Sequence, residues 1–193
     1  ILLIIKIKGG FCLRELRIHG RGGQGSVTAA ELIAFAAFEG GVYSQAFPAF
    51  GVERRGAPVQ AFVRFSDEKI RLRSQVYEPD YIIVQDPTLI GDVDVFMGMT
   101  AGGIAIVNTE KPDFDARVPE GVKVYAVDAT TIALEELGLP ITNTTLMGAF
   151  AAATGEIKLE ALEHALRSRF SGSMADKNVK AAERAYNLVG GAA

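Results

Sequence analysis

The sequence has few of the residues from which metal sites and disulfides are built. Cys12 is its one cysteine, and His19 and His164 are its two histidines. A structural zinc site needs about four such ligands close together, an all-thiolate iron–sulfur cluster needs about four cysteines, and a disulfide needs a pair. All three are therefore excluded within this chain, and any redox metal has to come from another one.

The chain also lacks an excess of basic residues and an apolar run of membrane length. It has 20 Lys and Arg against 23 Asp and Glu, a net charge of −3, whereas nucleic-acid-binding domains usually carry a positive surplus. Lys6 and Lys8 interrupt the first apolar run far short of the ~20 residues of a membrane span, and no secretory signal is evident. We expect a cytoplasmic protein that contacts neither nucleic acid nor membrane.

A glycine-rich loop is the most informative feature that is present. Residues 19–25 read HGRGGQG, between a strand-like run at 15–18 and an Ala-rich helix expected at 26–38. Glycines let the backbone approach a ligand closely, and amides at a helix N-terminus favour anions. We predict cofactor contacts from Arg21, Gly22, Gly23, Gln24 and Gly25. The alternative is a tight turn that only lets the helix pack on its sheet.

The loop lacks the residues that would complete a standard nucleotide motif. Gly20, Gly22 and Gly25 fit the G-x-G-x-x-G spacing, but residues 43–45 read Tyr-Ser-Gln where an acidic residue should hold a ribose. No Lys-Ser/Thr pair follows the last glycine, as a P-loop requires. The sequence therefore argues against NAD and against a P-loop.

A second loop, at residues 47–58, is long and irregular. Connections of this length are usually functional or disordered, and this one carries the adjacent Arg54 and Arg55. We predict that one arginine pairs with Glu53 or another carboxylate while the other faces a coenzyme or partner subunit. Two solvated charges on a mobile loop are the alternative.

Other polar residues allow two interpretations each. The run at 69–73 alternates as a strand with Lys69, Arg71 and Arg73 on one face, either a basic edge for an anion or acidic partner or a solvated edge strand. Asp86 follows an apolar strand and is either a site carboxylate or a helix cap. His19 is either an acid or base or a donor to a backbone carbonyl.

No nucleophile elbow, zinc-ligand spacing or Ser-His-Asp arrangement emerges, so we predict no catalytic residue and no metal ligand in this chain. Asn143 is expected to cap the helix from Thr144.

Strands and helices alternate along the chain, which indicates one α/β domain. We predict a single doubly wound, mostly parallel sheet flanked by helices, with a helix-rich C-terminal third. Residues 15–193 form this domain, and residues 1–14 are an N-terminal extension or edge strand. Strands are expected at 42–46, 59–65, 69–73, 81–84, 104–107 and 122–127, and helices at 26–38, 130–137, 144–153, 159–170 and 176–189.

Four segments in a fixed order resemble the gamma subunit of 2-oxoacid:ferredoxin oxidoreductases. They are residues 20–25 with Thr28-Ala29-Ala30, residues 48–56 (PAFGVERRG), residues 80–89, and Asn143-Thr144 with Gly148-Ala149. The resemblance extends from about Leu16 to the C-terminal helices. The ERRGAP form at 53–58 is most similar to the pyruvate and 2-oxoisovalerate members.

The resemblance implies a multisubunit anaerobic enzyme that decarboxylates a 2-oxoacid on thiamine diphosphate, reduces ferredoxin through 4Fe–4S clusters and forms an acyl-CoA. It places thiamine diphosphate and Mg²⁺ in alpha and beta subunits and clusters in beta and delta subunits. This chain would bind no cofactor alone, be inactive alone, and pack and gate the coenzyme A side of the site. The remaining alternative is a free-standing nucleotide- or phosphate-binding α/β domain.

Overall fold

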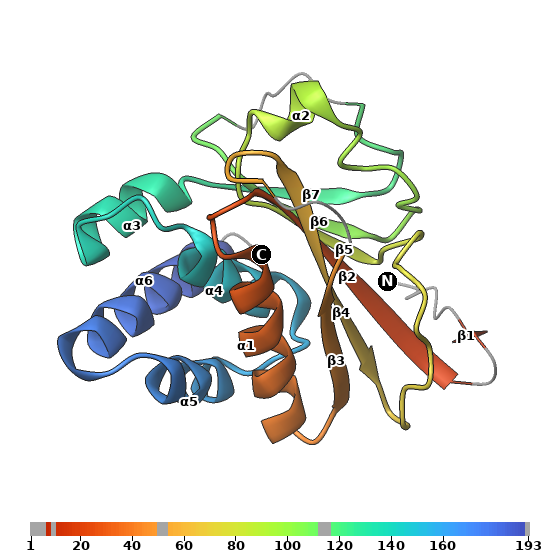
Figure 1. Ribbon diagram of the computed structural model, residues 1–193, viewed down its shortest axis with the longest axis horizontal. Helices are drawn as coiled ribbons and strands as arrows, with labels where there is room; N and C mark the ends of the chain where they lie inside the picture. The colour runs from red at the N-terminus through yellow and green to blue at the C-terminus, as the bar shows by residue number, and fades with distance from the viewer. Residues whose placement is uncertain (1–6, 9–10, 50–53, 112–116, 192–193) are drawn as a thin grey trace.

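The computed structural model describes residues 7–8, 11–49, 54–111 and 117–191 (Figure 1). Its strands are β1 Ile7–Lys8, β2 Phe11–Arg21, β3 Tyr43–Pro48, β4 Pro58–Ser66, β5 Tyr81–Val84, β6 Ile104–Asn108 and β7 Lys123–Val127. Its helices are α1 Ser26–Glu39, α2 Leu89–Asp92, α3 Ala129–Leu137, α4 Asn143–Thr154, α5 Leu159–Arg169 and α6 Gly172–Gly190.

The sheet is mixed, and its strand pairing changes from antiparallel to parallel at β2. The strand order is β3-β4-β2-β5-β6-β7, with β1 paired to β2 outside this path. Strands β2, β5, β6 and β7 run parallel, whereas β3, β4 and β2 pair antiparallel. The predicted α/β fold with a helix-rich C-terminal third is confirmed. Antiparallel pairs form more of the sheet than the predicted mostly parallel arrangement.

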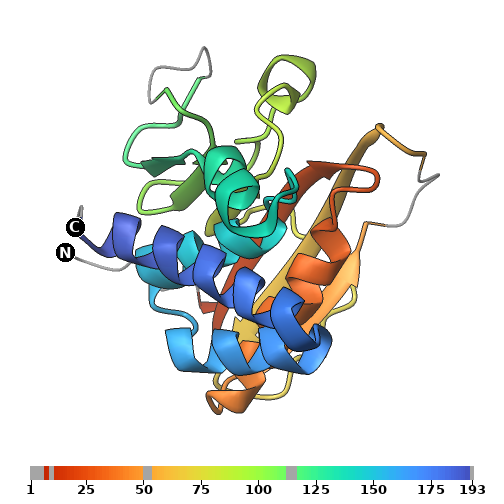
Figure 2. The ribbon, with the colours of Figure 1, turned by 90° about the vertical axis from the view of Figure 1, so that its left-hand side faces the viewer.

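The two faces of the sheet are covered differently. Helices α1 and α3–α6 lie together on one face (Figures 1 and 2). Because side chains alternate along a strand, Leu16 and Ile18 of β2 join that helical core while Arg17 and His19 point to the other face. There the β5–β6 connection packs α2 against a smaller apolar cluster. Crossovers therefore pass on both sides, as in a doubly wound fold.

The N-terminal residues fall partly inside the sheet. Strand β2 begins at Phe11, within the segment predicted to be an extension, and β1 pairs with its first residues. Residues 1–6 and 9–10 lie outside the described part of the chain. The division at residue 14 stays a prediction.

The predicted strand at 69–73 is wrong. Those residues form an irregular, mostly exposed segment. Both edges of β4 are already paired, one with β2 and one with β3, so a chain returning after Ser66 cannot pair with β4. The carbonyl groups of Ser74 and Leu72 instead accept hydrogen bonds from Arg64, at 2.7 and 3.5 Å.

Helices α4 and α6 approach each other closely at a glycine. A Cβ atom on Gly148 would collide with the backbone carbonyl of Ala182. Neither helix can move away without opening the core, because Phe150 and Leu146 of α4 are fully buried. Glycine at this position is thus a packing requirement, since only the absence of a side chain permits the crossing.

We expect Gly148→Ala to lower the free energy of unfolding by about 1–3 kcal/mol, the usual cost of overpacking a core. Gly190→Ala at the end of α6 is the matched control, because a Cβ there meets nothing within 4 Å; it should change stability by no more than ~1 kcal/mol. Urea unfolding of the purified chain measures both. Equal stability of the two variants would contradict the packing argument.

Candidate functional site

The candidate site lies where the carboxyl ends of the parallel strands meet. The glycine loop follows β2, Gln85 and Asp86 follow β5, and Asn108 ends β6. Crossovers leave β2 and β5 toward opposite sides, so this is the switch point at which open α/β sheets bind ligands. A cavity of about 450 Å³ opens here. It is lined by Gly23, Gln24, Gly25, Gln85, Asp86, Pro87, Asn108, Thr130, Pro140, Ile141, Thr142 and Asn143.

The N-terminal ends of α1, α3 and α4 all border this cavity, through Gly25, Thr130 and Asn143. Each helix N-terminus presents backbone N–H groups and the positive end of a helix dipole. The first residues of α1 lack a side-chain cap, because its N-cap is Gly25. This end of the cavity is therefore suited to an oxygen acceptor or an anion.

The glycines of the loop are required for two different reasons. A Cβ on Gly20 would collide with the Ser26 hydroxyl and the Gln85 amide, and one on Gly22 would collide with the carbonyl of Arg54. Gly25 and Gly23 have φ of +77° and +100°, which other residues rarely adopt. The loop is therefore tightly fitted as well as open to a ligand.

The glycine loop is joined by backbone hydrogen bonds to the second predicted loop. Gly22 N–H donates to the carbonyl of Ala57 at 2.9 Å, and Gly56 N–H donates to the carbonyl of Gly22 at 3.0 Å. Gly22 and Arg55 form an isolated parallel bridge. Two segments about 35 residues apart thus form one unit.

Arg54 and Arg55 lie exposed on that unit. Neither forms an ion pair with a carboxylate in the described part of the chain, and Glu53, the predicted partner, lies outside it. Their contact with a coenzyme or partner subunit stays a prediction.

Arg21 fastens the glycine loop to the segment after β5. Its guanidinium donates to Thr88 Oγ1 at 2.7 Å and Asp92 Oδ2 at 2.6 Å, and lies 3.3 Å from Asp86 Oδ2 and from the carbonyl of Gly56. The hydrogen bond to Asp92 raises the pKa of Arg21 above its ordinary value. Its donors are thus directed at this chain, so its first role is to position the loop.

Asp86 forms the turn before α2 and lines the cavity, but the N-cap of α2 is Thr88, so the predicted cap role of Asp86 is wrong. Its Oδ1 accepts from the Thr88 backbone at 3.0 Å, which holds the turn into α2, and its Oδ2 accepts from Gln24 at 2.8 Å. Burial alone would raise the pKa of Asp86, but the hydrogen bonds from Thr88 and Gln24 and the charge of Arg21 outweigh it. The pKa therefore lies below its ordinary value, and the carboxylate stays ionised.

His19 is a buried structural residue, as the second of its two interpretations predicted. The Arg17 Nε–H donates to His19 Nε2 at 2.9 Å, which leaves Nδ1 to carry the proton. The backbone of Val95 accepts from the ring. Burial and the positive charge of Arg17 lower the pKa of His19 to about 3, so the imidazole is neutral at physiological pH.

Gln85 is the site residue that the sequence analysis missed. Its side chain is buried, and its Oε1 accepts from the Ser26 hydroxyl at 2.6 Å. Its Nε2 has no hydrogen-bond partner among the described residues, although Gln85 lines the cavity. A buried unpaired donor is costly, so this nitrogen requires an acceptor at the cavity, either an ordered water or a bound ligand.

Two asparagines shape the same cavity. Asn108 donates to the carbonyl of Gln85 at 2.9 Å and so holds the end of β5. Asn143 is the first residue of α4 rather than its cap, which is Thr142. It still accepts from Thr144 N–H at 2.8 Å, and its amide lies 3.4 Å from the carbonyl of Gly25. Asn143 thus connects the starts of α1 and α4.

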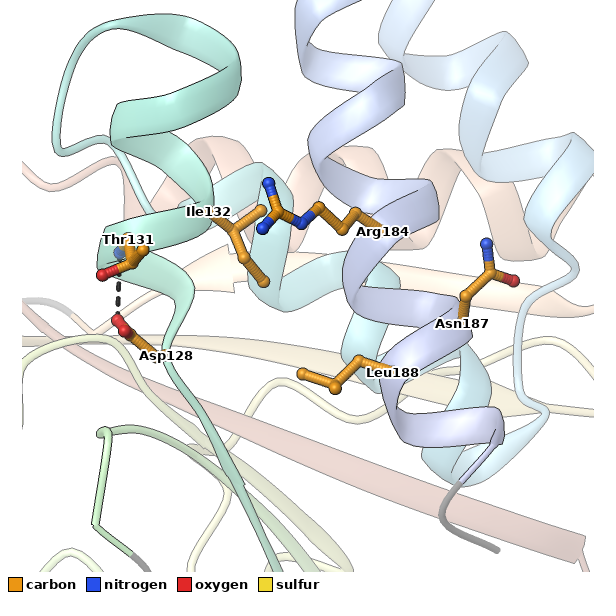
Figure 3. A pocket seen from close by; sticks show the side chains of 6 residues that line it. All are labelled: Asp128, Thr131, Ile132, Arg184, Asn187 and Leu188. Atoms are coloured by element: carbon orange, nitrogen blue, oxygen red, sulfur yellow. Dashed lines mark hydrogen bonds between the residues drawn. The ribbon is translucent and has the colours of Figure 1, made fainter.

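A second hollow, of about 490 Å³, lies between α3 and α6 (Figure 3). Asp128 there accepts from Thr131 N–H at 2.9 Å as the N-cap of α3. Arg184 forms ion pairs with Glu135 and Glu136. Among the described residues that line it, none has a buried unpaired donor like that of Gln85. The glycine-loop cavity is therefore the better candidate.

Within the described ranges, no three His, Cys, Asp or Glu side chains are grouped so that they could hold a metal ion. None of the helices in the same ranges combines the length and the apolar character needed to cross a membrane.

Comparison with known proteins defines the family. The profile of the pyruvate ferredoxin/flavodoxin oxidoreductase family matches residues 15–188. The pyruvate synthase subunit PorC of Methanosarcina barkeri is 58% identical, over 93% of this chain and 98% of its own. The pyruvate/ketoisovalerate oxidoreductases common subunit gamma of Thermococcus kodakarensis is 56% identical, over 90% and 95%.

A solved structure agrees with these relatives. The pyruvate oxidoreductase subunit PORC of Thermotoga maritima superimposes with a TM-score of 0.80 at 39% identity, over 91% of this chain and 96% of that one. The chain therefore belongs to the pyruvate ferredoxin/flavodoxin oxidoreductase family. Within the family it corresponds to the gamma subunit of the pyruvate enzyme, and the predicted resemblance is confirmed.

The neutral, buried state of His19 makes a pH dependence testable. Between its ordinary pKa of 6.5 and the folded value of about 3, the unfolded chain binds a proton that the folded chain does not. The free energy of unfolding should therefore fall as the pH drops through this range, by up to about 1.4 kcal/mol per pH unit from this group. His19→Gln should show a shallower slope in urea unfolding between pH 7.5 and 4.5. Parallel slopes would mean that His19 is not buried in its neutral form.

Proposed function

We propose that this gamma subunit forms the coenzyme A side of an active site that it shares with partner subunits. The complex would convert a 2-oxoacid, coenzyme A and oxidised ferredoxin into an acyl-CoA, CO₂ and reduced ferredoxin. Pyruvate is the proposed substrate, and 2-oxoisovalerate the alternative, because the relative from Thermococcus kodakarensis is named for both substrates.

The unpaired Nε2 of Gln85 is the observation that carries this proposal. Coenzyme A offers phosphate and amide oxygens, each an acceptor for such a donor. The α1 N-terminus and the glycine loop add backbone N–H groups at the same cavity. An acceptor oxygen bound here would satisfy Gln85 and lie at the positive ends of three helices.

The charges divide the site into two parts. The guanidinium of Arg21 forms ion pairs with Asp92 and Asp86. Its charge is therefore not available to a ligand in the cavity, and the cavity suits a neutral or singly charged group. The exposed Arg54 and Arg55 lie on the adjoining loop, where planar guanidinium groups suit phosphate oxygens. We assign the glycine loop and Gln85 to one part of the coenzyme, and the arginines to its phosphates.

The remaining cofactors belong to the partner subunits in this proposal. The described residues hold no group of ligands for a cluster, and Cys12 is the sole cysteine in the sequence. These residues do not fit a 4Fe–4S cluster. The alpha, beta and delta subunits would supply thiamine diphosphate, Mg²⁺ and the clusters, and ferredoxin would accept electrons from the complex. A cytoplasmic location follows from this role.

The isolated chain should not oxidise pyruvate, and anaerobic reconstitution with the partner subunits should restore dye-linked activity. The physical reason is the chain's single cysteine, which cannot ligate a cluster that needs about four thiolates. Activity and iron content are measured for the chain, the partners and the mixture. Turnover by the chain alone would refute the proposed division of roles.

Gln85→Leu in the assembled enzyme should raise the KM for coenzyme A about 2- to 12-fold, because a hydrogen bond to a neutral acceptor such as an amide oxygen contributes about 0.5–1.5 kcal/mol. The KM for pyruvate should stay unchanged. Asn187→Leu, which removes an amide from the hollow between α3 and α6, is the matched control and should alter neither constant. An unchanged KM for coenzyme A in the assembled Gln85 variant would contradict the proposal that coenzyme A binds in this cavity.

A further inference from the structure

Two buried arginines hold an irregular layer over the sheet face that the long helices leave uncovered. We call residues 67–80 and 93–103 the loop layer. Arg64 of β4 is fully buried, and it donates to the carbonyl of Ser74 at 2.7 Å. Arg17 of β2, also buried, donates to the carbonyls of Val95 at 3.2 Å and Met97 at 2.5 Å.

These charge-assisted hydrogen bonds order segments that have no regular structure of their own. A buried guanidinium is costly unless its donors are paired, so Arg64 and Arg17 select one arrangement of the backbone above them. The two segments also contact each other, because Gly98 packs against the carbonyl of Tyr77, where any Cβ would collide. The loop layer is therefore a preorganised surface.

The outer side of this layer combines large apolar and basic side chains. Tyr77 is 69% exposed, Met97 63% and Leu72 42%. Lys69, Arg71 and Arg73 are exposed beside Leu72. Tyrosine, methionine and arginine are enriched in protein interfaces. We call Lys69, Arg71, Leu72, Arg73, Tyr77 and Met97 the docking face.

The basic side chains of this face are not held in ion pairs by the described parts of the chain. None of Lys69, Arg71 and Arg73 forms an ion pair with a carboxylate there, although the whole chain carries a net charge of −3. Three exposed carboxylates belong to the same segment: Asp67 and Glu68 precede the basic run at the turn after β4, and Glu78 follows Tyr77. The cations are thus available to an acidic surface of another molecule.

We propose that the docking face binds an acidic surface of a partner subunit, with Tyr77, Met97 and Leu72 at the centre of the contact and the three cations around it. This inference rests on the proposed function, in which the chain assembles with such subunits. A second copy of this chain is disfavoured, because two such faces would bring like charges together. Nucleic acid is disfavoured by the net negative charge.

The test uses the full chain co-expressed with its partner subunits. Arg71→Glu with Arg73→Glu should weaken assembly at least about tenfold, since like charges would then face each other. Lys177→Glu with Lys180→Glu reverses two exposed cations on α6, outside the face, and should leave the assembly constant unchanged. Size-exclusion chromatography over a dilution series gives the constants. Added salt should weaken the unmodified complex more than the Arg71/Arg73 variant.

A second variant guards against a simple loss of folding. Tyr77→Ser with Met97→Ser changes two exposed side chains and should weaken assembly while the isolated chain keeps its melting temperature. Amide exchange should show residues 69–77 protected in the complex relative to the free chain. Assembly at normal strength by both double variants would overturn the inference. Binding of nucleic acid by the unmodified chain that both double variants lose, with subunit assembly unchanged, would overturn it as well. Failure of the unmodified chain to assemble would instead contradict the proposed function.

Discussion

The ion pair between Glu15 and Arg64 is the interaction on which the two halves of the sheet depend. Its Oε1 and Nε atoms lie 2.8 Å apart, both side chains are buried, and the residues face each other across β2 and β4. This is the junction between the parallel and antiparallel strands. Because removing one partner would leave an unpaired buried charge, the pair fixes the register of β4 on β2, and Arg64 also lies over the ring of Phe47 in β3.

The same junction explains why the two faces of the sheet differ. On one face, apolar residues of β2 and β4 pack under the helices. On the other, Glu15, Arg17 and Arg64 need oxygen and nitrogen partners that a helix with its internally bonded backbone does not offer. Irregular segments with free carbonyl groups satisfy the two arginines, and Arg64 in turn donates to Glu15. The loop layer therefore covers this polar face of the sheet with backbone groups that can accept its hydrogen bonds.

The sequence predicted most elements well because their signals are local. Continuous apolar runs identified β5 and β6, and the stripes at three- and four-residue spacing identified α5 and α6. The segment at 69–73 was misread because its alternation is that of a strand. Its structure depends on a segment distant in the sequence, because β3 already pairs with the outer edge of β4.

The candidate site was predicted in part for the same reason. The glycines of residues 20–25 and the turn formed by Asp86 were predictable because each depends on a short stretch of sequence. Gln85 carried one usable signal, a polar residue at the carboxyl end of a buried strand. Its amide is oriented by the hydrogen bond from Ser26 to its oxygen, which leaves the nitrogen unpaired. Ser26 is 59 residues away in the sequence, so no local motif could predict this contact. The engagement of Arg21 by Asp92 is equally remote, which is why the guanidinium was expected to face a ligand.

The backbone bonds between Gly22 and the segment at 56–57 have a mechanical consequence. Each loop supplies both a donor and an acceptor to the other, so neither can open alone without breaking two hydrogen bonds. The two segments are therefore held together as one unit. A partner subunit that binds at Arg54 and Arg55 would contact the same unit that lines the cavity at Gly23 and Gly25.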